Sequence, residues 1–384
     1  MKKLFIITGE LSGDLHAATV VEELKKTMPD LEIEGIGGKH MANAGVKIFK
    51  DHSKMGIVGL TLKALFDHVK LAKEIIDYLN NSFKPDLVLL VDYGGFNLRI
   101  AKFLKKYNFE TFYYISPQVW ASRKHRVSKI RKYISKLMVI FPFEEKFYKK
   151  QNITAKYVGH PLVSQLYFGY QKEDFIKENG LNENKKIVGV FPGSRKFELS
   201  YMMPIYTQAI REIFEHQKKI QFCISQAENM SEEFLNKYIN DLRYEGIDIK
   251  LIKGQNHALL ACSDALILTS GTVTLEAAMY ETPMCVCYKG PLPFYWIYLA
   301  VRHISKVSLP NIVADKDIVQ EFIQHRAQPE LIASEILSLL HNQTKREKMI
   351  AELKNIKAKF GEKIASQEVA KTIREYFDEN KKGN

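Results

Sequence analysis

The stretch DALILTSGTVTLEAAMYETP, Asp264–Pro283, carries the clearest fold signal in this chain of 384 residues. Its apolar run Ala265–Leu268 predicts a buried strand, and Val273–Tyr280 predicts a helix that ends before Pro283. Gly271 lies in the tight turn between them, where its freedom of backbone angle is useful. A strand, a turn and a helix in this order direct unpaired backbone N–H groups to one point, which suits a phosphate.

Side chains around this turn add to the phosphate signal. Glu276 lies one helical turn further on, and a carboxylate there can accept two hydrogen bonds from neighbouring sugar hydroxyls, such as those of a ribose. Ser270 or Thr272 can cap the helix. Phosphate donors beside a ribose acceptor predict a nucleotide site. The alternative is an ordinary strand–helix unit with a solvated glutamate.

Strands and helices alternate in two series along the chain, which predicts an α/β fold with parallel sheets. The polar segment 163–186 separates the series and is typical of an interdomain connection. We expect two Rossmann-like domains that face an interdomain cleft, residues 1–165 and 166–340, and C-terminal helices in residues 341–384 that pack back on the first domain. The predicted strands are 4–8, 33–36, 87–91, 112–115, 139–141, 187–191, 220–225, 249–252 and 265–268.

Composition narrows the class of protein. Hydrophobic residues make up 46% and charged residues 26% of the chain, values typical of a soluble globular protein. The start, Met1–Ile7, predicts a first buried strand rather than a signal peptide, because its apolar run is short and a polar turn follows. The four cysteines are too few and too irregularly spaced for a disulfide framework or a zinc site, so we expect a reducing, cytoplasmic compartment.

The net charge of +12 is unevenly distributed. Residues 101–150 contain 13 Lys or Arg and only three Glu. Such a segment attracts phosphates, whether of nucleic acid, anionic lipid headgroups or a phosphorylated substrate, although it can also be simply a solvated basic face. The sequence contains no recognised nucleic-acid-binding module, so a nucleic-acid partner is not expected.

Two further residues follow predicted strands. Asp92 comes directly after the strand 87–91, where the carboxyl ends of parallel strands form a ligand-binding crevice, so it is a candidate general base or a helix cap. Arg195 ends the turn that follows the strand 187–191, and its planar guanidinium suits a diphosphate. In the first strand–helix turn, Ser12 or Asp14 is the expected cap of the helix 15–27.

Two apolar stretches, residues 55–66 and 291–301, are each compatible with a core helix or a lipid-facing surface. Asp315-Lys-Asp317 spells D-x-D, a pattern that can hold a divalent metal beside a nucleotide diphosphate. It precedes a predicted helix over 318–323, so helix capping is the favoured interpretation and no metal is expected. On that helix Glu321 and Gln324 would share one face.

Nine short motifs together resemble those of the lipid-A-disaccharide synthase family, bacterial glycosyltransferases of family 19 with the GT-B architecture. They follow the family's order, so their joint presence is far more specific than any one of them. The motifs are GELSGD (9–14), GIGG (35–38), MGI (55–57), PQVWA (117–121), VGHP (158–161), PGSR (192–195), SGTVTLE (270–276), SLPN (308–311) and EFIQ (321–324).

The resemblance implies a reaction. UDP-2,3-diacylglucosamine would donate its sugar to 2,3-diacylglucosamine 1-phosphate (lipid X), giving the β-1,6-linked lipid A disaccharide 1-phosphate and UDP. It implies an inverting transferase that needs neither metal nor cofactor, attached peripherally to the anionic cytoplasmic face of the inner membrane. A homodimer is left open. The alternative is another enzyme of this fold, such as a UDP-GlcNAc 2-epimerase, which would convert UDP-GlcNAc without an acceptor.

The resemblance also implies roles for individual residues. Asp92 matches the family's proposed catalytic carboxylate, which would take the proton from the acceptor's 6-hydroxyl. Arg195 matches the arginine expected near the UDP diphosphate. Residues that match those expected to hold the nucleotide and donor sugar are Glu276, Asn311 and Gln324. The remaining expected substrate-binding residues are Ser12, Ser270, Gly271 and Thr272.

Three positions depart from the family's usual pattern. Ser122 replaces the second Trp of the Pro-Gln-Val-Trp-Ala-Trp-Arg motif, and Gly59 stands where a Glu is common. Both departures concern details of how the acceptor would be bound. Gly95 stands where an Asp is common, which leaves Asp92 as the only carboxylate in the loop 92–97.

Overall fold

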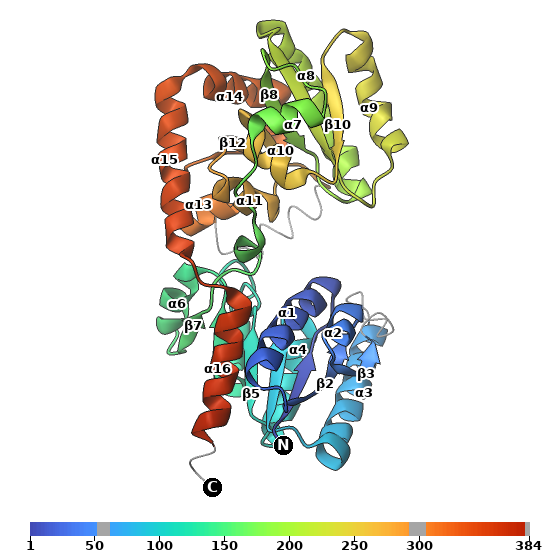
Figure 1. Cartoon of the computed structure of the whole chain (residues 1–384), viewed down its shortest axis with the longest axis vertical. Coiled ribbons are helices and arrows are strands. Elements are labelled where there is room, and N and C mark those ends of the chain that lie inside the picture. The colour runs from blue at the N-terminus through green and yellow to red at the C-terminus, as the bar shows by residue number, and fades with distance from the viewer. Residues whose placement is uncertain (52–61, 292–304, 381–384) are drawn as a thin grey trace. The chain divides into compact units, whose positions relative to one another are not determined.

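The computed structural model describes residues 1–51, 62–291 and 305–380 (Figure 1). The chain divides into two compact units. Unit 1 comprises Met1–Ser164 and Glu362–Asn384, and unit 2 comprises Gln165–Gly361. Most of the two apolar stretches noted above, together with Gly59, lies outside the described residues.

Unit 1 is built on seven parallel strands in the order β3-β2-β1-β4-β5-β6-β7. The order reverses between β1 and β4, and ligands of open α/β sheets bind at such a switch point. The strands are β1 (Lys3–Ile7), β2 (Glu32–Gly37), β3 (Lys47–Asp51), β4 (Leu87–Val91), β5 (Thr111–Tyr114), β6 (Lys136–Val139) and β7 (Ala155–Tyr157).

Helices cover this sheet on both faces (Figure 1). All five residues of β4 are apolar and buried, as expected for a central strand of a doubly covered parallel sheet. The helices of unit 1 are α1 (Leu11–Thr27), α2 (Lys39–Asn43), α3 (Leu62–Tyr78), α4 (Gly94–Lys106), α5 (Arg126–Tyr133), α6 (Pro142–Lys149) and α16 (Ala365–Glu379), with a π-helical turn at Leu79–Phe83 and a 3-10 turn at Val163–Gln165.

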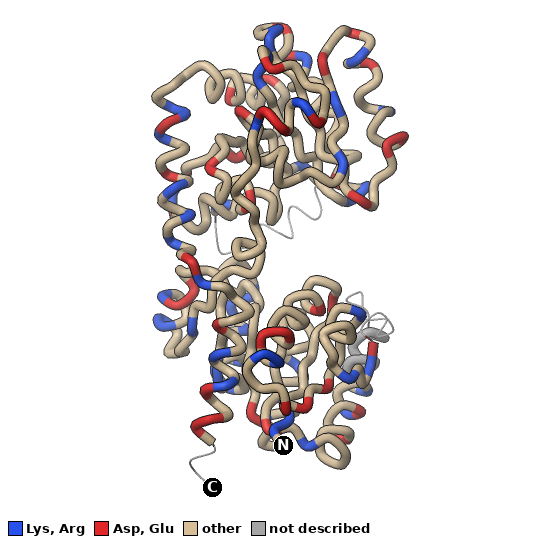
Figure 2. Tube along the Cα trace, viewed as in Figure 1, with Lys and Arg blue, Asp and Glu red and all other residues tan. Residues whose placement is uncertain are grey.

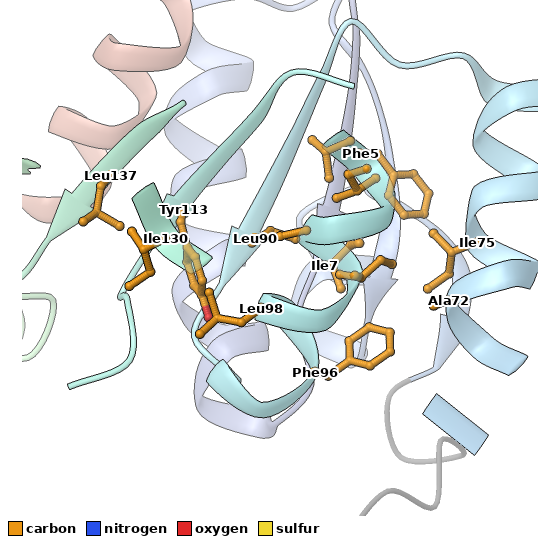
Figure 3. Close-up of a cluster of buried hydrophobic side chains, with 14 of the residues drawn as sticks. Phe5, Ile7, Ala72, Ile75, Leu90, Phe96, Leu98, Tyr113, Ile130 and Leu137 are labelled. Atoms are coloured by element: carbon orange, nitrogen blue, oxygen red, sulfur yellow. The ribbon is translucent and has the colours of Figure 1, made fainter. Parts of the chain in front are cut away.

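One core layer of unit 1 lies between the sheet and α3, α4 and α5 (Figure 3). Alternate strand residues point to the same face, so Phe5, Ile7 and Leu90 all lie in this layer. Ile75 of α3 and Phe96 of α4 are fully buried against them. The burial of Phe96 anchors the start of α4 and therefore the turn that connects it to β4.

Unit 2 repeats the plan with six parallel strands in the order β10-β9-β8-β11-β12-β13, which reverses between β8 and β11. Its strands are β8 (Lys186–Phe191), β9 (Ile220–Gln226), β10 (Ile249–Lys253), β11 (Ala265–Thr269), β12 (Met284–Tyr288) and β13 (Gln320–Ile323). Its helices are α7 (Lys172–Glu178), α8 (Lys196–His216), α9 (Glu232–Tyr244), α10 (Asn256–Cys262), α11 (Val273–Met279), α13 (Leu309–Ala314), α14 (Pro329–His341) and α15 (Gln343–Phe360), with a 3-10 turn at Gln324–Arg326.

The prediction of a helix over residues 318–323 is wrong. Gln320–Ile323 forms β13 and pairs in parallel with β12. Asp315 therefore caps no following helix; it is the left-handed C-cap residue of α13, with φ of 57°. Asp317 is exposed, and the two carboxylates of the D-x-D pattern lie on a surface turn.

The expected boundary at residue 341 also differs from the structure. Helix α15 belongs to unit 2, where it packs against α11 and α14. Only Glu362–Asn384 joins unit 1, where α16 packs against α1. The amphipathic pattern of residues 343–377 could not separate the two helices by partner, because both bury one apolar face.

Candidate functional site

The turn after β4 holds Asp92 in a strained backbone. Asp92 and Tyr93 have φ of 51° and 47°, a left-handed region that non-glycine residues seldom adopt. The Asp92 carbonyl oxygen accepts hydrogen bonds from Asn97 Nδ2 at 2.8 Å and from the Tyr113 hydroxyl at 2.7 Å. These two donors hold the turn in a conformation that its own residues disfavour, which is typical of functional sites.

The Asp92 carboxyl is half-buried. Burial raises its pKa, the negative charge of Glu10 raises it further, and a hydrogen bond from the Tyr93 backbone opposes both. A carboxylate with a raised pKa holds a proton more readily than an exposed one, which suits a general base near neutral pH.

Three loops meet around this carboxyl. A side chain added at Gly9, after β1, would place its Cβ 2.1 Å from the Tyr93 ring, so only glycine allows the loops 9–14 and 92–97 to approach so closely. A Cβ at Gly94 would lie 2.3 Å from Pro117 and 3.3 Å from the Arg126 guanidinium. The loop 116–126 therefore lies against the same turn, and it brings Arg126 of the basic segment close to it.

Asp14 does not cap α1 as predicted. Asp14 is a residue of α1 itself, in its first turn. Its buried carboxylate accepts hydrogen bonds from the backbone N–H groups of Gly38 at 2.7 Å, His40 at 2.9 Å and Met41 at 3.2 Å. It thus binds the start of α2, the next helix along the chain. Ser12 is exposed in the first turn of α1, and α1 has no side-chain cap.

Sequence reasoning missed Glu144. Its buried carboxylate accepts Trp120 Nε1 at 3.1 Å and the Phe141 backbone N–H at 2.9 Å. Burial raises the pKa of Glu144 to about 7, despite these hydrogen bonds. Glu144 therefore fixes Trp120, in the loop that contacts the Asp92 turn. Its position three residues after the helix N-cap was a usable sign, because that is the capping-box position.

In unit 2 the turns after β8 and β11 enclose a cavity of about 490 Å³ at the switch point of the sheet. This volume is in the range of ligand pockets. Five of the predicted site residues line the cavity together. Those five residues are Arg195, Ser270, Gly271, Thr272 and Glu276. Sequence reasoning missed Ser225 and Asn256, which also line the cavity and whose side chains are hydrogen-bonded to each other at 2.7 Å.

The turn after β11 is open towards this cavity. A Cβ added at Gly271 would meet no described protein atom within 4 Å, so packing within the chain does not require glycine there. Ser270 and Thr272 do not cap α11 through their side chains; the Thr274 hydroxyl donates to the Gly271 carbonyl oxygen at 2.8 Å instead. The Gly271 backbone is therefore open to the cavity.

Charges of both signs face the cavity. The exposed Arg195 guanidinium pairs with Glu198 at 2.9 Å. Glu276 is mostly buried, and its carboxylate lies 3.3 Å from His257 Nε2. Burial raises the pKa of Glu276, while the charge and hydrogen bond of His257 lower it. Neither His257 nor Glu198 was predicted to have a role; Glu198 was visible as a carboxylate three residues after Arg195.

Asn311 and Gln324 do not line this cavity. The Asn311 side-chain oxygen accepts the Ile318 and Val319 N–H groups at 2.8 and 3.0 Å, and its nitrogen donates to the Val319 carbonyl and to Glu321, both at 2.9 Å. These four hydrogen bonds use both acceptor sites and both donors of the Asn311 side-chain amide. Asn311 therefore holds the turn before β13. Gln324 is buried and accepts the Gly290 N–H at 3.5 Å.

A family model described as lipid-A-disaccharide synthetase matches residues 4–375. A lipid-A-disaccharide synthase of Coxiella burnetii is 35% identical over 374 residues, covering 97% of this chain and 98% of the relative.

Solved structures agree with the fold. A UDP-GlcNAc 2-epimerase of Neisseria meningitidis, bound to UDP-GlcNAc, has a TM-score of 0.65 at 15% identity and covers 98% of this chain and 100% of its own. A glycosyltransferase of Rickettsia africae has a TM-score of 0.58 at 11% identity, with 98% of each chain covered. These likenesses confirm the predicted GT-B architecture of two Rossmann-like domains.

Proposed function

Because the chain belongs to the lipid-A-disaccharide synthase family, we propose that it joins UDP-2,3-diacylglucosamine to 2,3-diacylglucosamine 1-phosphate (lipid X). The products are the β-1,6-linked disaccharide 1-phosphate and UDP. Family membership makes the chain a glycosyltransferase of lipid A biosynthesis. The observation that supports a UDP-sugar donor is the cavity of unit 2, which joins an arginine, an open glycine turn and a carboxylate.

Each part of this cavity suits one part of UDP. The Arg195 guanidinium offers planar paired donors to the diphosphate and would exchange Glu198 for it. The open turn at Gly271 lets phosphate oxygens approach backbone N–H groups directly, helped by the Ser270 and Thr272 hydroxyls. Glu276 would accept hydrogen bonds from the ribose hydroxyls.

The chemistry is a single displacement with inversion. The 6-hydroxyl oxygen of the acceptor attacks C1 of the donor sugar as the bond from C1 to the UDP phosphate oxygen breaks. Asp92 accepts the hydroxyl proton, and its raised pKa favours this transfer. Arg195 stabilises the negative charge that develops on the departing UDP.

Three other predicted residues do not line the cavity of unit 2. Ser12 is exposed in the first turn of α1 and stays a proposed substrate contact. Asn311 contributes indirectly, since its side chain holds the turn before β13. Gln324 has a left-handed backbone, with φ of 55°, directly after β13, and stays a proposed contact to the donor sugar.

An anionic membrane surface suits the charge of unit 1. The basic segment 101–150 lies entirely in this unit and contains the end of α4, then β5, α5, β6 and α6. The Lys and Arg residues of the chain are drawn in blue in Figure 2. A basic segment of this kind is attracted to anionic headgroups and to a phosphorylated lipid acceptor. Within the described residues, none of the helices is long and apolar enough to span a membrane.

UDP binding tests the donor site. Arg195→Ala should weaken UDP binding by about tenfold or more, because a charge-assisted bidentate contact is lost. Arg211→Ala is the matched control. Arg211 lies on α8 and pairs with Glu245 at a distance of 2.7 Å, and neither residue lines the cavity. Equal affinities of both variants for UDP would refute the assignment of Arg195. Conversion of UDP-GlcNAc without acceptor would favour the epimerase instead.

A further inference from the structure

The carboxylate assigned to the ribose lies close to a histidine ring. Glu276 lies on α11 with its side chain 15% exposed, and His257 lies on α10 with its side chain 39% exposed. His257 Nε2 is 3.3 Å from Glu276 Oε2. The contact therefore joins two helices that begin beside the same cavity, since Asn256, the residue before His257, lines it together with Glu276.

We propose that His257 is a positioning residue of the nucleotide site: its ring N–H holds the Glu276 carboxylate in the orientation that the ribose hydroxyls require. The inference rests on the proposed function, in which Glu276 binds ribose. A glutamate has three rotatable side-chain bonds, so a carboxylate without a partner would sample several orientations. A fixed one loses less entropy when the ribose binds.

The His257 ring is itself held in place. Its centroid lies 6.1 Å from the ring of Tyr280, the C-cap residue of α11, and the Tyr280 hydroxyl donates to the Tyr167 carbonyl oxygen at 3.0 Å. Tyr170 also packs against Tyr280, with ring centroids 6.1 Å apart. The histidine therefore has an aromatic support that does not depend on Glu276.

The groups around Glu276 decide how the site responds to pH. Tyr280 is the C-cap residue of α11, one turn after Glu276, and Tyr170 approaches it from the segment before α7. Arg195 and Glu198 line the same cavity from the start of α8. Burial raises the pKa of Glu276, and His257 is the neighbour that lowers it. His257 thus opposes the effect of burial.

The affinity for UDP should depend on the ionisation of Glu276. Ribose hydroxyls donate to an ionised carboxylate, so the ribose contribution to UDP affinity is present above the pKa of Glu276 and is lost as pH falls through it. Without His257 that pKa rises, and the loss of affinity moves to higher pH. A residue that only stabilised the fold would not move this profile.

The experiment measures UDP binding to the full chain by calorimetry from pH 5 to 8.5. His257→Phe removes the donor but keeps an aromatic ring beside Tyr280, and His257→Gln keeps a neutral N–H donor. We expect about tenfold weaker UDP binding for His257→Phe at pH 7, and an intermediate loss for His257→Gln. The acid limb of the profile should move to higher pH in both variants.

A second ligand, 2′-deoxy-UDP, separates the possible failures. Wild type should bind it more weakly than UDP, and His257→Phe should lose little further affinity for it, because the contact that His257 supports is already missing. A wild type that does not bind UDP overturns the proposed function together with this inference. A wild type that binds UDP and discriminates against 2′-deoxy-UDP, with unchanged UDP affinity and pH profile in both variants, overturns the role of His257 alone.

Discussion

The carboxylate of Asp14 should contribute to stability rather than to chemistry. It is fully buried and accepts three backbone N–H groups at the start of α2. Replacing it by alanine leaves these donors without their acceptor, at about 1 kcal/mol each, so Asp14→Ala should lose about 3 kcal/mol of unfolding free energy. Domains are stable by only about 5–15 kcal/mol, so this loss is large.

The assay is urea unfolding followed by tryptophan fluorescence. The chain has two tryptophans, and a Trp296→Phe background leaves Trp120 of unit 1 as the only reporter. Ser12→Ala is the matched control, since Ser12 lies in the same helical turn, is exposed and makes no cap. A loss below about 1 kcal/mol for Asp14→Ala, or one equal to that of Ser12→Ala, would refute this account of Asp14.

Three further predictions test the two sites. Asp92→Asn should lower kcat by about 100-fold or more while UDP affinity stays unchanged in calorimetry, and an active variant would refute the base assignment. Gly271→Ala should leave Tm unchanged, because the added Cβ has open space, yet weaken UDP binding; unchanged affinity would show that phosphate does not approach this backbone. The Glu144 carboxyl has its pKa raised from 4.5 to about 7, so the stability linked to it is present below pH 4.5 and is lost as pH rises through 7. Wild type should therefore lose about 3 kcal/mol relative to Glu144→Gln between pH 4 and pH 8 in urea unfolding, and a constant difference would contradict the raised pKa.

The apolar strands and the turns that follow them could be predicted from the sequence. β4 was placed at Leu87–Val91 and the central segment at Ala265–Tyr280 because a continuous apolar run and a glycine turn are local signals. The residues at these turns, Asp92 and Arg195, were found for the same reason. Strand order was not predictable, although it brings each turn to the switch point of its sheet.

The incorrect and missing predictions concern contacts between segments that are distant in the sequence. Gln320–Ile323 is a strand because it pairs with β12, more than 30 residues earlier in the chain. Asp14 is bound to a helix that begins 25 residues later, and His257 is paired with Glu276 on the next helix. Local capping rules cannot distinguish such partners, since the same carboxylate satisfies its own helix or another one equally well.

Turnover with the two proposed lipids tests the central claim most directly. Purified full-length chain is mixed with UDP-2,3-diacylglucosamine and 2,3-diacylglucosamine 1-phosphate in detergent micelles, and products are followed by mass spectrometry and by NMR of the new anomeric carbon. We predict equal amounts of UDP and a β-1,6-linked disaccharide 1-phosphate, with Asp92→Asn inactive. Release of UDP without disaccharide, an α linkage, or no product at any detergent concentration would contradict the account.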